Sequence, residues 1–432
     1  MKVTQSRQIV LEMLLSIEKE EKKSHLLIRD VLDKYDYLDA RDKAFIKHLT
    51  EGVLERRLTL DYVIDSMSKT PVKKMKPAIR SIIRMGAYQI LYMDSIPDAA
   101  ACNEAVNLAA LKGFHGLKGF VNGVLRSIAS NKDKIAWPER SEDEVRYLSV
   151  RYSMPDWISK RFLDNYGFEK TEAVLNAFLR QSDVTVRMIT ENDRTEELIR
   201  VWEEKGVRIE RDEVIPYAYH LSGVEGVTNL EGFSDGAFAI QDISSMIALE
   251  AAGFKPGESV IDVCAAPGGK ACFAAWKTKN TVKAYDLTER KAERIRENAK
   301  RLHLEQITAE VADATVFKPE LENTADVVIA DLPCSGLGVL KRKPEIRYRL
   351  TNEDILELSR LQRLILENAV RYVKAGGRIL YSTCTITPEE NEENRKWIEE
   401  NHPVSLIEER QILPDDHKGC DGFYYAILKR ED

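Results

Sequence analysis

The sequence predicts a Rossmann-like α/β domain at its C-terminal end, preceded by an all-α domain and a small α+β insert. Helical periodicity runs through the first 130 residues with almost no strand signal. Beyond residue 237, short apolar runs alternate with helical segments, and a glycine-rich turn joins an apolar run to a helix, as in an open α/β sheet. We therefore expect four segments: an all-α domain over 1–130, a linker over 131–145, a small α+β insert over 146–236 and the α/β domain over 237–432.

The first domain differs from the rest of the chain in its charge. The 432 residues carry a formal charge of −7, which taken alone argues against a nucleic-acid partner. Residues 1–130, however, hold 21 Lys and Arg against 16 Asp and Glu, and residues 66–128 hold nine bases against three acids. A basic segment inside an acidic protein suits a polyanion. A solvated helix face is the alternative.

Local signals mark the linker and the insert. Residues 131–145 are polar and contain Pro138. Pro155 is expected just inside the start of the helix that follows. Residues 184–188 alternate as a strand does, a helix follows from Arg194, and short strands complete the insert.

The α/β domain begins with a strand, a tight turn and a helix. Residues 260–263 are mostly apolar, the turn contains two glycines, and a helix follows from about Ala271. Glycines let a ligand approach the backbone, and the helix N-terminus offers unpaired N–H groups. The spacing is neither that of a phosphate loop nor that of a dinucleotide fingerprint. A ligand with a small carboxylate end and a ribose suits the turn, and tight packing alone is the alternative.

Other polar residues are expected around this turn. Asp286 ends the second strand, 24 residues after Asp262, where a doubly wound sheet holds ribose hydroxyls. An N-cap for the next helix is the alternative. Asp313 follows the third strand and is placed to meet an adenine amino group, or to be a solvated turn aspartate. The Gln-Asp-x-x-Ser pattern at 241–245 is interpreted as a structural brace for the turn.

Two later strands end in cysteine motifs. Residues 325–331 lead into Asp-Leu-Pro-Cys, which ends at Cys334, and residues 378–383 lead into Cys384. Because ligands lie at the carboxyl ends of strands in an open α/β sheet, we expect these thiols to be neighbours although 50 residues separate them. A buried, small apolar role is the alternative for each cysteine.

Paired thiols suit covalent catalysis on a pyrimidine. Carbon 5 of cytosine is a poor nucleophile, but a thiolate that adds to carbon 6 creates an enamine-like intermediate that can attack an electrophilic methyl group. A base then removes the carbon-5 proton, and the thiol is eliminated. The reaction requires an activated cysteine, an acid near N3 of the base and a group that assists elimination.

These motifs resemble the RNA cytosine-C5 methyltransferase family in the glycine turn at 262–270, the Asp-Leu-Pro-Cys at 331–334 and the Ser-Thr-Cys at 382–384. The resemblance implies S-adenosylmethionine (SAM) as cofactor, Cys384 as the nucleophile and Cys334 as the residue that assists product release. The SAM contacts that it implies are Cys264, Ala265, Ala266, Pro267, Gly268, Gly269, Lys270, Asp286, Asp313 and Asp331. Ala271, Leu332 and Thr385 replace the usual threonine, alanine and serine, and none of these departures removes a reacting atom.

Two further catalytic residues follow from the chemistry. We expect Asp331 to hydrogen-bond N3 and the exocyclic amine of the base while holding a proton, with capping of its loop or a shared SAM contact as alternatives. We expect Lys270 to orient the base or to brace Asp331.

The first domain also resembles a known module. Residues 41–45, 52–61 and 120–126 are similar to a NusB-like RNA-binding domain, which is fused to such a catalytic unit in bacterial small-subunit ribosomal RNA methyltransferases. With it, the resemblance covers nearly the whole chain.

RNA contacts are expected outside the first domain as well. A basic loop with a tyrosine at 340–348, expected beside the active-site strand end, suits backbone tracking and stacking on single-stranded RNA, with a solvated charge run as the alternative. The candidate RNA contacts are Lys341, Arg342, Lys343 and Arg347 in this loop, and Arg187 in the insert. For Arg187, a structural ion pair is the alternative.

The remaining segments complete the predicted sheet. The helix that begins at Asn352 is expected to run to about Val373 and to stop at Ala375, Gly376 and Gly377, and an acid-rich helix begins at Pro388. The last strand covers 423–428. The order of elements predicts a mixed seven-stranded sheet whose final strands are antiparallel.

Composition bounds the compartment and the partners. No apolar run reaches the roughly 18 residues that cross a membrane, and the first residues do not resemble a signal peptide. The six cysteines form no CxxC pairs, so we expect no zinc or other metal, no disulfide framework and a reducing cytoplasm. Nothing in the sequence demands a dimer, and a monomer is expected.

The resemblance predicts SAM-dependent methylation of carbon 5 of a cytosine in small-subunit (16S) ribosomal RNA, through a cysteine–carbon 6 adduct on an unstacked base. A tRNA cytosine-C5 methyltransferase would share this chemistry, but the NusB-like segment disfavours it. A non-catalytic RNA-binding assembly factor is the alternative from another class, and the two intact cysteines disfavour it. An N-methyltransferase would carry Asp/Asn-Pro-Pro-Tyr where this chain has Asp-Leu-Pro-Cys.

Overall fold

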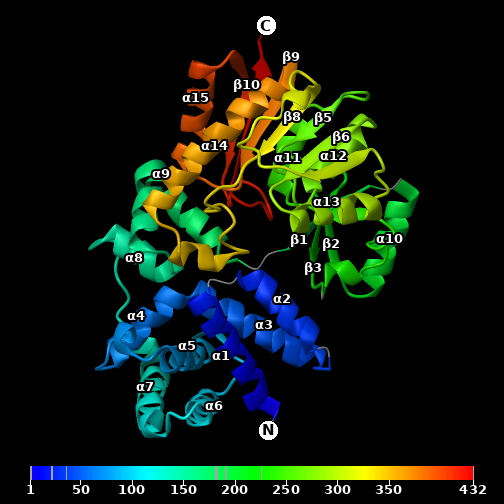
Figure 1. The fold of residues 1–432 in the computed structure, drawn as a ribbon. Coiled ribbons are helices and arrows are strands. Elements are labelled where there is room, and N and C mark those ends of the chain that lie inside the picture. The colour runs from blue at the N-terminus through cyan, green and yellow to red at the C-terminus, as the bar shows by residue number, and fades with distance from the viewer. Residues whose placement is uncertain are drawn as a thin grey trace. The chain divides into compact units, whose positions relative to one another are not determined.

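The computed structural model describes residues 2–20, 23–35, 37–180, 183–189, 192–224 and 226–431. The chain forms two units, Met1–Arg180 with Leu340–Arg349, and Gln181–Val339 with Leu350–Asp432. Figure 1 colours both by residue number. Within the described ranges, no helix is long and apolar enough to cross a lipid bilayer.

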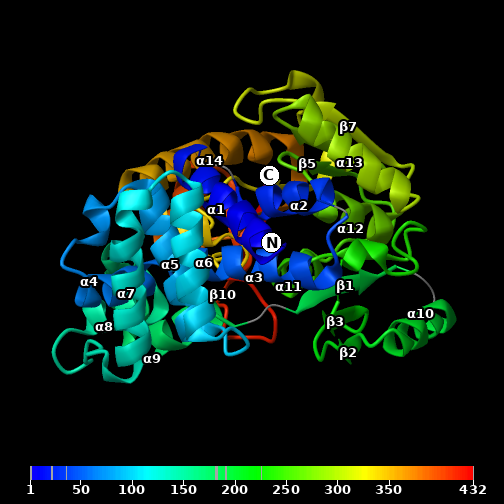
Figure 2. The ribbon, with the colours of Figure 1, turned by 90° about the horizontal axis from the view of Figure 1, so that it is seen from below.

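Helices build the first unit (Figure 2). They are α1 (Lys2–Glu20), α2 (Ser24–Lys34), α3 (Ala40–Glu55), α4 (Arg57–Met67), α5 (Pro77–Tyr92), α6 (Asp98–Leu111), α7 (Lys118–Asn131), α8 (Glu144–Tyr152) and α9 (Asp156–Ala177). The predicted all-α domain is confirmed. α5 begins at Pro77, whose fixed φ suits a first helical turn, and Ile79, Ile82 and Ile83 at the predicted spacing are buried in the core.

The segment Leu340–Arg349 packs among these helices. Ser24 donates hydrogen bonds from its backbone N and its Oγ to the two carboxylate oxygens of Glu345, at 3.0 and 2.5 Å. The hydroxyl of Tyr348 donates to the carbonyl of Leu54 at 2.8 Å, and the Tyr348 ring lies 4.9 Å from the guanidinium of Arg57. These partners make the segment part of the framework of the first unit.

The predicted insert boundaries, 146–236, differ from the observed units. α8 and α9 belong to the first unit, where Thr59 Oγ1 donates to Val150 O at 2.6 Å and Leu58 N donates to Ser153 Oγ at 2.9 Å. The sheet of the insert also continues past residue 236, because β4 (Phe238–Ile240) pairs with β1 (Val184–Met188). Sequence signals mark helices and strands, but they do not show which neighbour each one packs against.

The second unit contains two sheets. The smaller has the order β2-β3-β1-β4, with antiparallel pairing throughout, and includes β2 (Arg208–Arg211) and β3 (Ala218–Ser222). α10 (Asn192–Glu204) packs on this sheet through Trp202, whose ring meets Phe238 edge-on at 5.0 Å between centroids. This is the β-rich part of the predicted α+β insert.

The larger sheet has the order β10-β11-β9-β8-β5-β6-β7. Its strands are β5 (Val260–Asp262), β6 (Val282–Asp286), β7 (Ile307–Val311), β8 (Ala325–Asp331), β9 (Val373–Thr383), β10 (Val404–Ile412) and β11 (Phe423–Arg430). Adjacent strands from β7 to β9 are parallel, whereas β11 is antiparallel to both of its neighbours, which confirms the predicted mixed sheet. The strand order reverses between β5 and β8, the place where open α/β sheets bind ligands.

Helices cover both faces of this sheet (Figure 1). Phe273 of α12 (Gly269–Thr278) and Ile295 of α13 (Glu289–Arg301) are buried in one core, together with α11 (Ile243–Ala251). Leu366 of α14 (Asn352–Tyr372) and Ile398 of α15 (Glu392–Asn401) are buried in the other. The central strands are therefore covered on both sides, as parallel strands require.

Two local predictions differ from the structure in detail. α14 ends at Tyr372, which confirms the predicted end near Val373, but the glycines expected to stop it lie inside β9. Glycine is needed at position 377 because a Cβ there would clash with the carbonyl oxygen of Asp326 on the neighbouring strand, at 2.8 Å. Pro155 occupies the N-cap of α9 and not its first turn.

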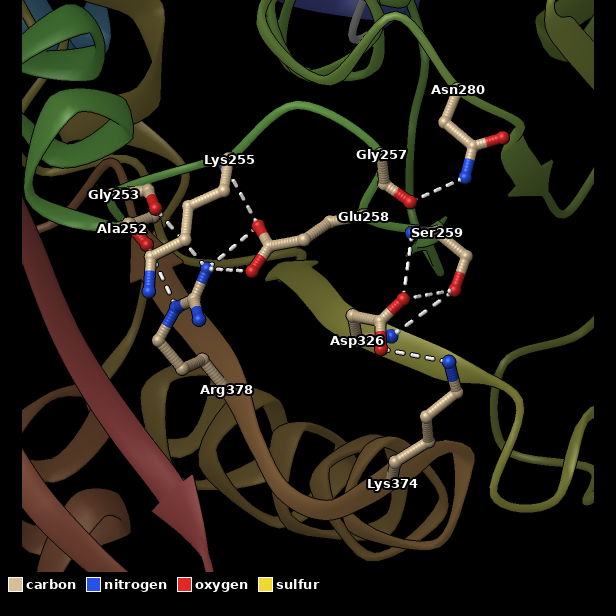
Figure 3. Close-up of polar contacts among 10 residues, drawn as sticks. All are labelled: Ala252, Gly253, Lys255, Gly257, Glu258, Ser259, Asn280, Asp326, Lys374 and Arg378. Atoms are coloured by element: carbon tan, nitrogen blue, oxygen red, sulfur yellow. Dashed lines mark hydrogen bonds and ion pairs between the residues drawn. The ribbon is translucent and has the colours of Figure 1, made fainter.

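A polar cluster fixes the amino-terminal ends of the central strands, away from the ligand end of the sheet (Figure 3). Arg378 donates to Glu258 at 2.8 Å and to the carbonyl of Ala252 at 3.0 Å. Asp326 accepts hydrogen bonds from Lys374 Nζ at 2.7 Å and from Ser259 N at 2.8 Å. Burial alone would raise the pKa of Asp326, but these hydrogen bonds lower it to about 2. The strand starts are thus held by contacts separate from the candidate site.

Candidate active site

Polar side chains gather at the carboxyl edge of four neighbouring strands. Asp262 ends β5, Asp286 ends β6, Asp331 ends β8, and Cys384 directly follows β9. These strands are parallel neighbours, so their ends lie on one edge of the sheet, as the sequence predicted.

The turn between β5 and α12 requires glycine at one position. Gly268 has a φ of +104°, and a Cβ there would stand 3.3 Å from the Cα of Ile295 on α13. The N–H of Gly268 donates to the carbonyl of Ala265 at 2.6 Å, which closes the turn. α12 then begins at Gly269, so its unpaired N-terminal N–H groups lie at the same edge, where they favour an anionic group.

The two predicted cofactor aspartates differ in their surroundings. Asp286 is buried and accepts hydrogen bonds from Ala266 N in the turn at 2.9 Å and from Lys291 Nζ at 2.8 Å. It does not cap the next helix, whose N-cap is Thr288. Asp313 is exposed and accepts from the backbone N and the hydroxyl of Thr315, the geometry of a turn aspartate. Asp286 is therefore part of the turn, whereas Asp313 lies at its margin.

Two buried acceptor atoms beside the turn have no hydrogen-bond partner in the described part of the chain, Oδ2 of Asp262 and Oε1 of Gln241. Asp262 is 0% exposed, and burial together with neighbouring carboxylates raises its pKa to about 8. Gln241 Nε2 donates to Ser245 Oγ at 3.4 Å and lies 3.9 Å from a Cβ placed on Gly269. The unpaired acceptors fit a ligand that carries hydrogen-bond donors. Asp262 is not among the site residues predicted from the sequence.

Asp331 is held by two side chains. Lys270 Nζ donates to its Oδ2, and Ser382 Oγ donates to its Oδ1, each at 2.8 Å. Burial opposes the charge of Lys270, but the pKa of its ammonium is raised by Asp331. Of the two roles expected for Lys270, bracing Asp331 is the contact that the structure contains.

The two thiols meet at the strand edge, as predicted. Cys334 Sγ lies 3.2 Å from Cys384 Sγ. The hydrogen bond to Cys384 and burial raise the pKa of the Cys334 thiol well above its usual value, and Glu390 and Asp331 act in the same direction. Cys334 therefore keeps its thiol proton at neutral pH.

A buried carboxylate joins the two cysteine loops. Glu390 accepts hydrogen bonds from Ser335 N at 2.8 Å, from Thr387 Oγ1 at 2.7 Å and from Gln362 Nε2 at 3.1 Å. Ser335 Oγ also lies 2.7 Å from Thr385 Oγ1, so the residues after each cysteine are linked directly. Burial raises the pKa of Glu390. Glu390 is not among the predicted site residues, because the sequence of residues 388–394 indicates only the acid-rich start of a helix.

Two of the candidate RNA contacts are corrected, because they are buried. Arg187 is 0% exposed, with its guanidinium 4.8 Å from the ring centroid of Phe273 and 5.6 Å from that of Trp276. It contacts aromatic rings, and no ion pair of this residue occurs among the described residues. Arg347 is 1% exposed and donates to the carbonyls of Ser153 and Leu340.

The other basic residues of that loop remain accessible. Arg342 is exposed, and Lys341 and Lys343 are half-buried, all within the segment that packs in the first unit. At the start of α5, Lys73, Lys74 and Lys76 are also exposed. The first unit therefore presents cations at two places.

Comparison with known proteins identifies three matching families. Residues 248–429 match the family "16S rRNA methyltransferase RsmB/F", residues 4–130 match the NusB family, and residues 154–228 match the ferredoxin-like domain of RsmF/B-like methyltransferases. The NusB-like resemblance of the first domain is thus confirmed.

Relatives match nearly the whole chain. The probable ribosomal RNA small subunit methyltransferase B of Bacillus subtilis is 35% identical over 100% of both chains. The corresponding protein of Synechocystis is 31% identical over 98% of this chain and 99% of its own. The crystal structure of PH0851 superposes with a TM-score of 0.81 at 27% identity, over 98% of this chain and 99% of that one. On this evidence, the chain belongs to the RsmB/F family of 16S rRNA methyltransferases, which are SAM-dependent.

Proposed function

We propose that the protein methylates carbon 5 of a cytosine in small-subunit ribosomal RNA, through a covalent bond between Cys384 and carbon 6 of the base. The observation that carries the proposal is the 3.2 Å approach of Cys334 Sγ to Cys384 Sγ at the strand edge that also bears Asp331. A methyltransferase that acts on an amino nitrogen has no use for two thiols at this position.

The cofactor fits the turn after β5. SAM supplies an electrophilic methyl group when bound. The N-terminus of α12 favours its carboxylate, and the unpaired oxygens of Asp262 and Gln241 suit its ammonium and hydroxyl donors. Asp286 is held against the turn by Ala266 N and is assigned to the ribose. Asp313, exposed beyond β7, remains the candidate for the adenine amino group.

Cys384 is assigned as the nucleophile because the Ser-Thr-Cys motif at 382–384 resembles the nucleophile motif of RNA cytosine-C5 methyltransferases. Burial and the hydrogen bond to Cys384 raise the pKa of Cys334, so Cys334 stays a thiol while Cys384 attacks. The thiolate adds to carbon 6, and the electron pair displaced from the ring double bond moves toward carbon 5 and N3. Asp331 is assigned to N3, and the ammonium of Lys270, which donates to Asp331, is the source of the proton that neutralises the charge developing there.

The same geometry gives Cys334 its later role. Carbon 5 then bonds to the transferred methyl group and still carries its hydrogen. Once Cys384 is bonded to carbon 6, it no longer offers Cys334 a hydrogen bond or a competing negative charge, and those were two of the causes that raised the pKa of Cys334. Cys334 can then lose its proton and accept the one on carbon 5. The electron pair of that C–H bond restores the ring double bond, and the Cys384 thiolate departs.

The NusB-like segment favours ribosomal RNA over tRNA. It carries the exposed cluster of Lys73, Lys74 and Lys76, and the loop with Lys341, Arg342 and Lys343 packs in the same unit. We assign both groups to RNA phosphates, which attract lysine and arginine regardless of sequence. The target cytosine must leave its base stack to reach a thiol at a strand end.

The test uses purified small-subunit RNA, small ribosomal subunits and total tRNA, each incubated with the full chain and methyl-labelled SAM. Nuclease digestion and mass spectrometry then identify the product nucleoside. We expect 5-methylcytidine from small-subunit RNA or its particle. Label confined to tRNA overturns the substrate assignment, and a methyl group on a nitrogen overturns the chemistry.

A further inference from the structure

A cluster of metal-binding side chains lies in the second unit and contains neither of the two thiols. Asp212 directly follows β2, His220 belongs to β3, and His417 lies between β10 and β11. Their ligand atoms all lie within 4.8 Å of one another. Asp212 Oδ2 is 2.8 Å from His220 Nε2 and 2.7 Å from His417 Nε2.

We propose that Asp212, His220 and His417 bind one zinc ion. Two imidazole nitrogens and a carboxylate form a donor set that suits Zn²⁺ better than Mg²⁺ or Ca²⁺, which prefer oxygen ligands. In a tetrahedral site with bonds near 2.0–2.1 Å, ligand atoms stand about 3.3 Å apart. The two histidine rings therefore move about half an ångström away from Asp212 to admit the ion.

The charge of the cluster favours a cation. The Asp212 side chain is 1% exposed, and its side-chain partners among the described residues are the two histidines. Among the described residues, no lysine or arginine forms an ion pair with this buried carboxylate. Zinc between the three groups would offset that charge directly.

The surroundings already orient the ligands. The other oxygen of Asp212 accepts hydrogen bonds from Val214 N and Ile215 N, at 2.8 and 2.7 Å. The second ring nitrogen of His220, Nδ1, lies 3.2 Å from Thr185 Oγ1. Such contacts to the atoms that do not bind the ion are typical of metal sites, where they fix the ring and the carboxylate.

The third ligand gives access to solvent. The His417 side chain is 19% exposed, so a water molecule can complete the coordination. The loop that carries His417 packs closely against His220: a Cβ on Gly419 would stand 3.2 Å from His220 Nδ1. In the same loop, Lys418 pairs with Glu210 of β2. The ion would thus join the small sheet to the loop that leads into β11 of the large sheet.

The prediction of no metal rests on the absence of CxxC pairs. A ligand set drawn from positions 212, 220 and 417 has no local spacing to reveal it. Only the fold brings His417 to the other two residues.

The experiment measures zinc on tag-free full-length protein after chelator treatment and gel filtration. Elemental analysis and calorimetric titration with zinc chloride are run on wild type and on His417→Gln, Asp212→Asn and His402→Ala. His417→Gln is the decisive variant, because a glutamine amide can keep donating to Asp212 Oδ2 but is a poor zinc ligand. His402→Ala removes a histidine of the same unit that lies outside the cluster.

We expect wild type and His402→Ala to bind one zinc ion per chain and to gain about 5 °C or more in Tm when zinc exceeds its dissociation constant by 100-fold. His417→Gln and Asp212→Asn should lose both effects. Equal zinc binding by His417→Gln overturns the proposal, since zinc held by the Cys334–Cys384 pair would survive that change. No zinc binding by wild type overturns it as well, and leaves the cluster a hydrogen-bonded triad.

Discussion

Replacement of Glu390 should affect catalysis by the two thiols more than it affects the stability of the fold. Glu390→Ala removes the acceptor of Ser335 N, Thr387 Oγ1 and Gln362 Nε2. The glutamine keeps its bond to the carbonyl of Pro333, and the threonine hydroxyl can rotate, but the Ser335 N–H is left buried without a partner. That costs about 1–3 kcal/mol, and the vacated volume adds roughly 1 kcal/mol. We expect the free energy of unfolding to fall by about 2–4 kcal/mol.

The catalytic effect should exceed what the lost stability explains. Ser335 directly follows Cys334, so release of its N–H lets the Cys334 sulfur shift, and a misplacement near 1 Å can cost roughly 100-fold in rate. Because Cys334 acts after methyl transfer, the protein–RNA adduct should persist longer in Glu390→Ala than in wild type. The assay is single-turnover methylation at a temperature where circular dichroism shows the variant folded, with the adduct quantified on denaturing gels.

Two control variants define the result. Glu390→Gln keeps an oxygen for Ser335 N and should remain within about tenfold of wild type, a change of no more than about 1.4 kcal/mol in the barrier. Arg378→Ala breaks the cluster at the far end of the strands, so it should lose comparable stability while its methylation rate stays near that of wild type. The reasoning is refuted if Glu390→Ala releases the adduct as fast as wild type does. It is also refuted if Arg378→Ala loses as much methylation rate as Glu390→Ala.

Three further changes test the site and the corrected assignments. The pKa of Asp262 is about 8 in the folded protein and about 3.9 in the unfolded chain, so wild type loses stability as pH rises between these values. In cofactor-free thermal scans, the difference in Tm between Asp262→Asn and wild type should therefore grow in favour of the variant from pH 5 to pH 8 and then level off. Gly268→Ala should weaken SAM binding at least tenfold by calorimetry, because its Cβ meets Ile295, whereas Gly257→Ala, with a similar positive φ and open space, should leave SAM affinity unchanged. For Arg187→Met, the free energy of unfolding should be at most about 1 kcal/mol below that of wild type, because an apolar chain replaces a buried cation that makes no hydrogen bond to the described residues. RNA affinity should not change, and a large loss of RNA binding would restore Arg187 as a contact.

The sequence predicted those features that depend on local patterns. Alternation of apolar runs and helical segments indicated the mixed sheet, and the position of Cys334 and Cys384 after separate strands indicated their proximity. Both inferences rest on one regularity, that parallel strands of a sheet end at a common edge.

Features that depend on distant packing could not be predicted in the same way. Arg187 packs against aromatic rings of α12, which lies about 90 residues later in the chain. The alternating pattern of its strand is the same whether the arginine is buried or exposed to solvent. Arg347 is buried because residues 340–349 pack in the first unit, although they follow the Cys334 loop in sequence. The orienting role of Glu390 is likewise visible only when two loops are placed side by side.

The central claim is tested most directly by trapping the protein–RNA adduct. Wild type, Cys384→Ala and Cys334→Ala are incubated with small-subunit RNA and methyl-labelled SAM, and then separated on denaturing gels. The account predicts that Cys384→Ala neither methylates nor forms an adduct, whereas Cys334→Ala accumulates a methylated adduct that it cannot release. Methylation of carbon 5 by Cys384→Ala, or an adduct that depends on Cys334 instead, would contradict it.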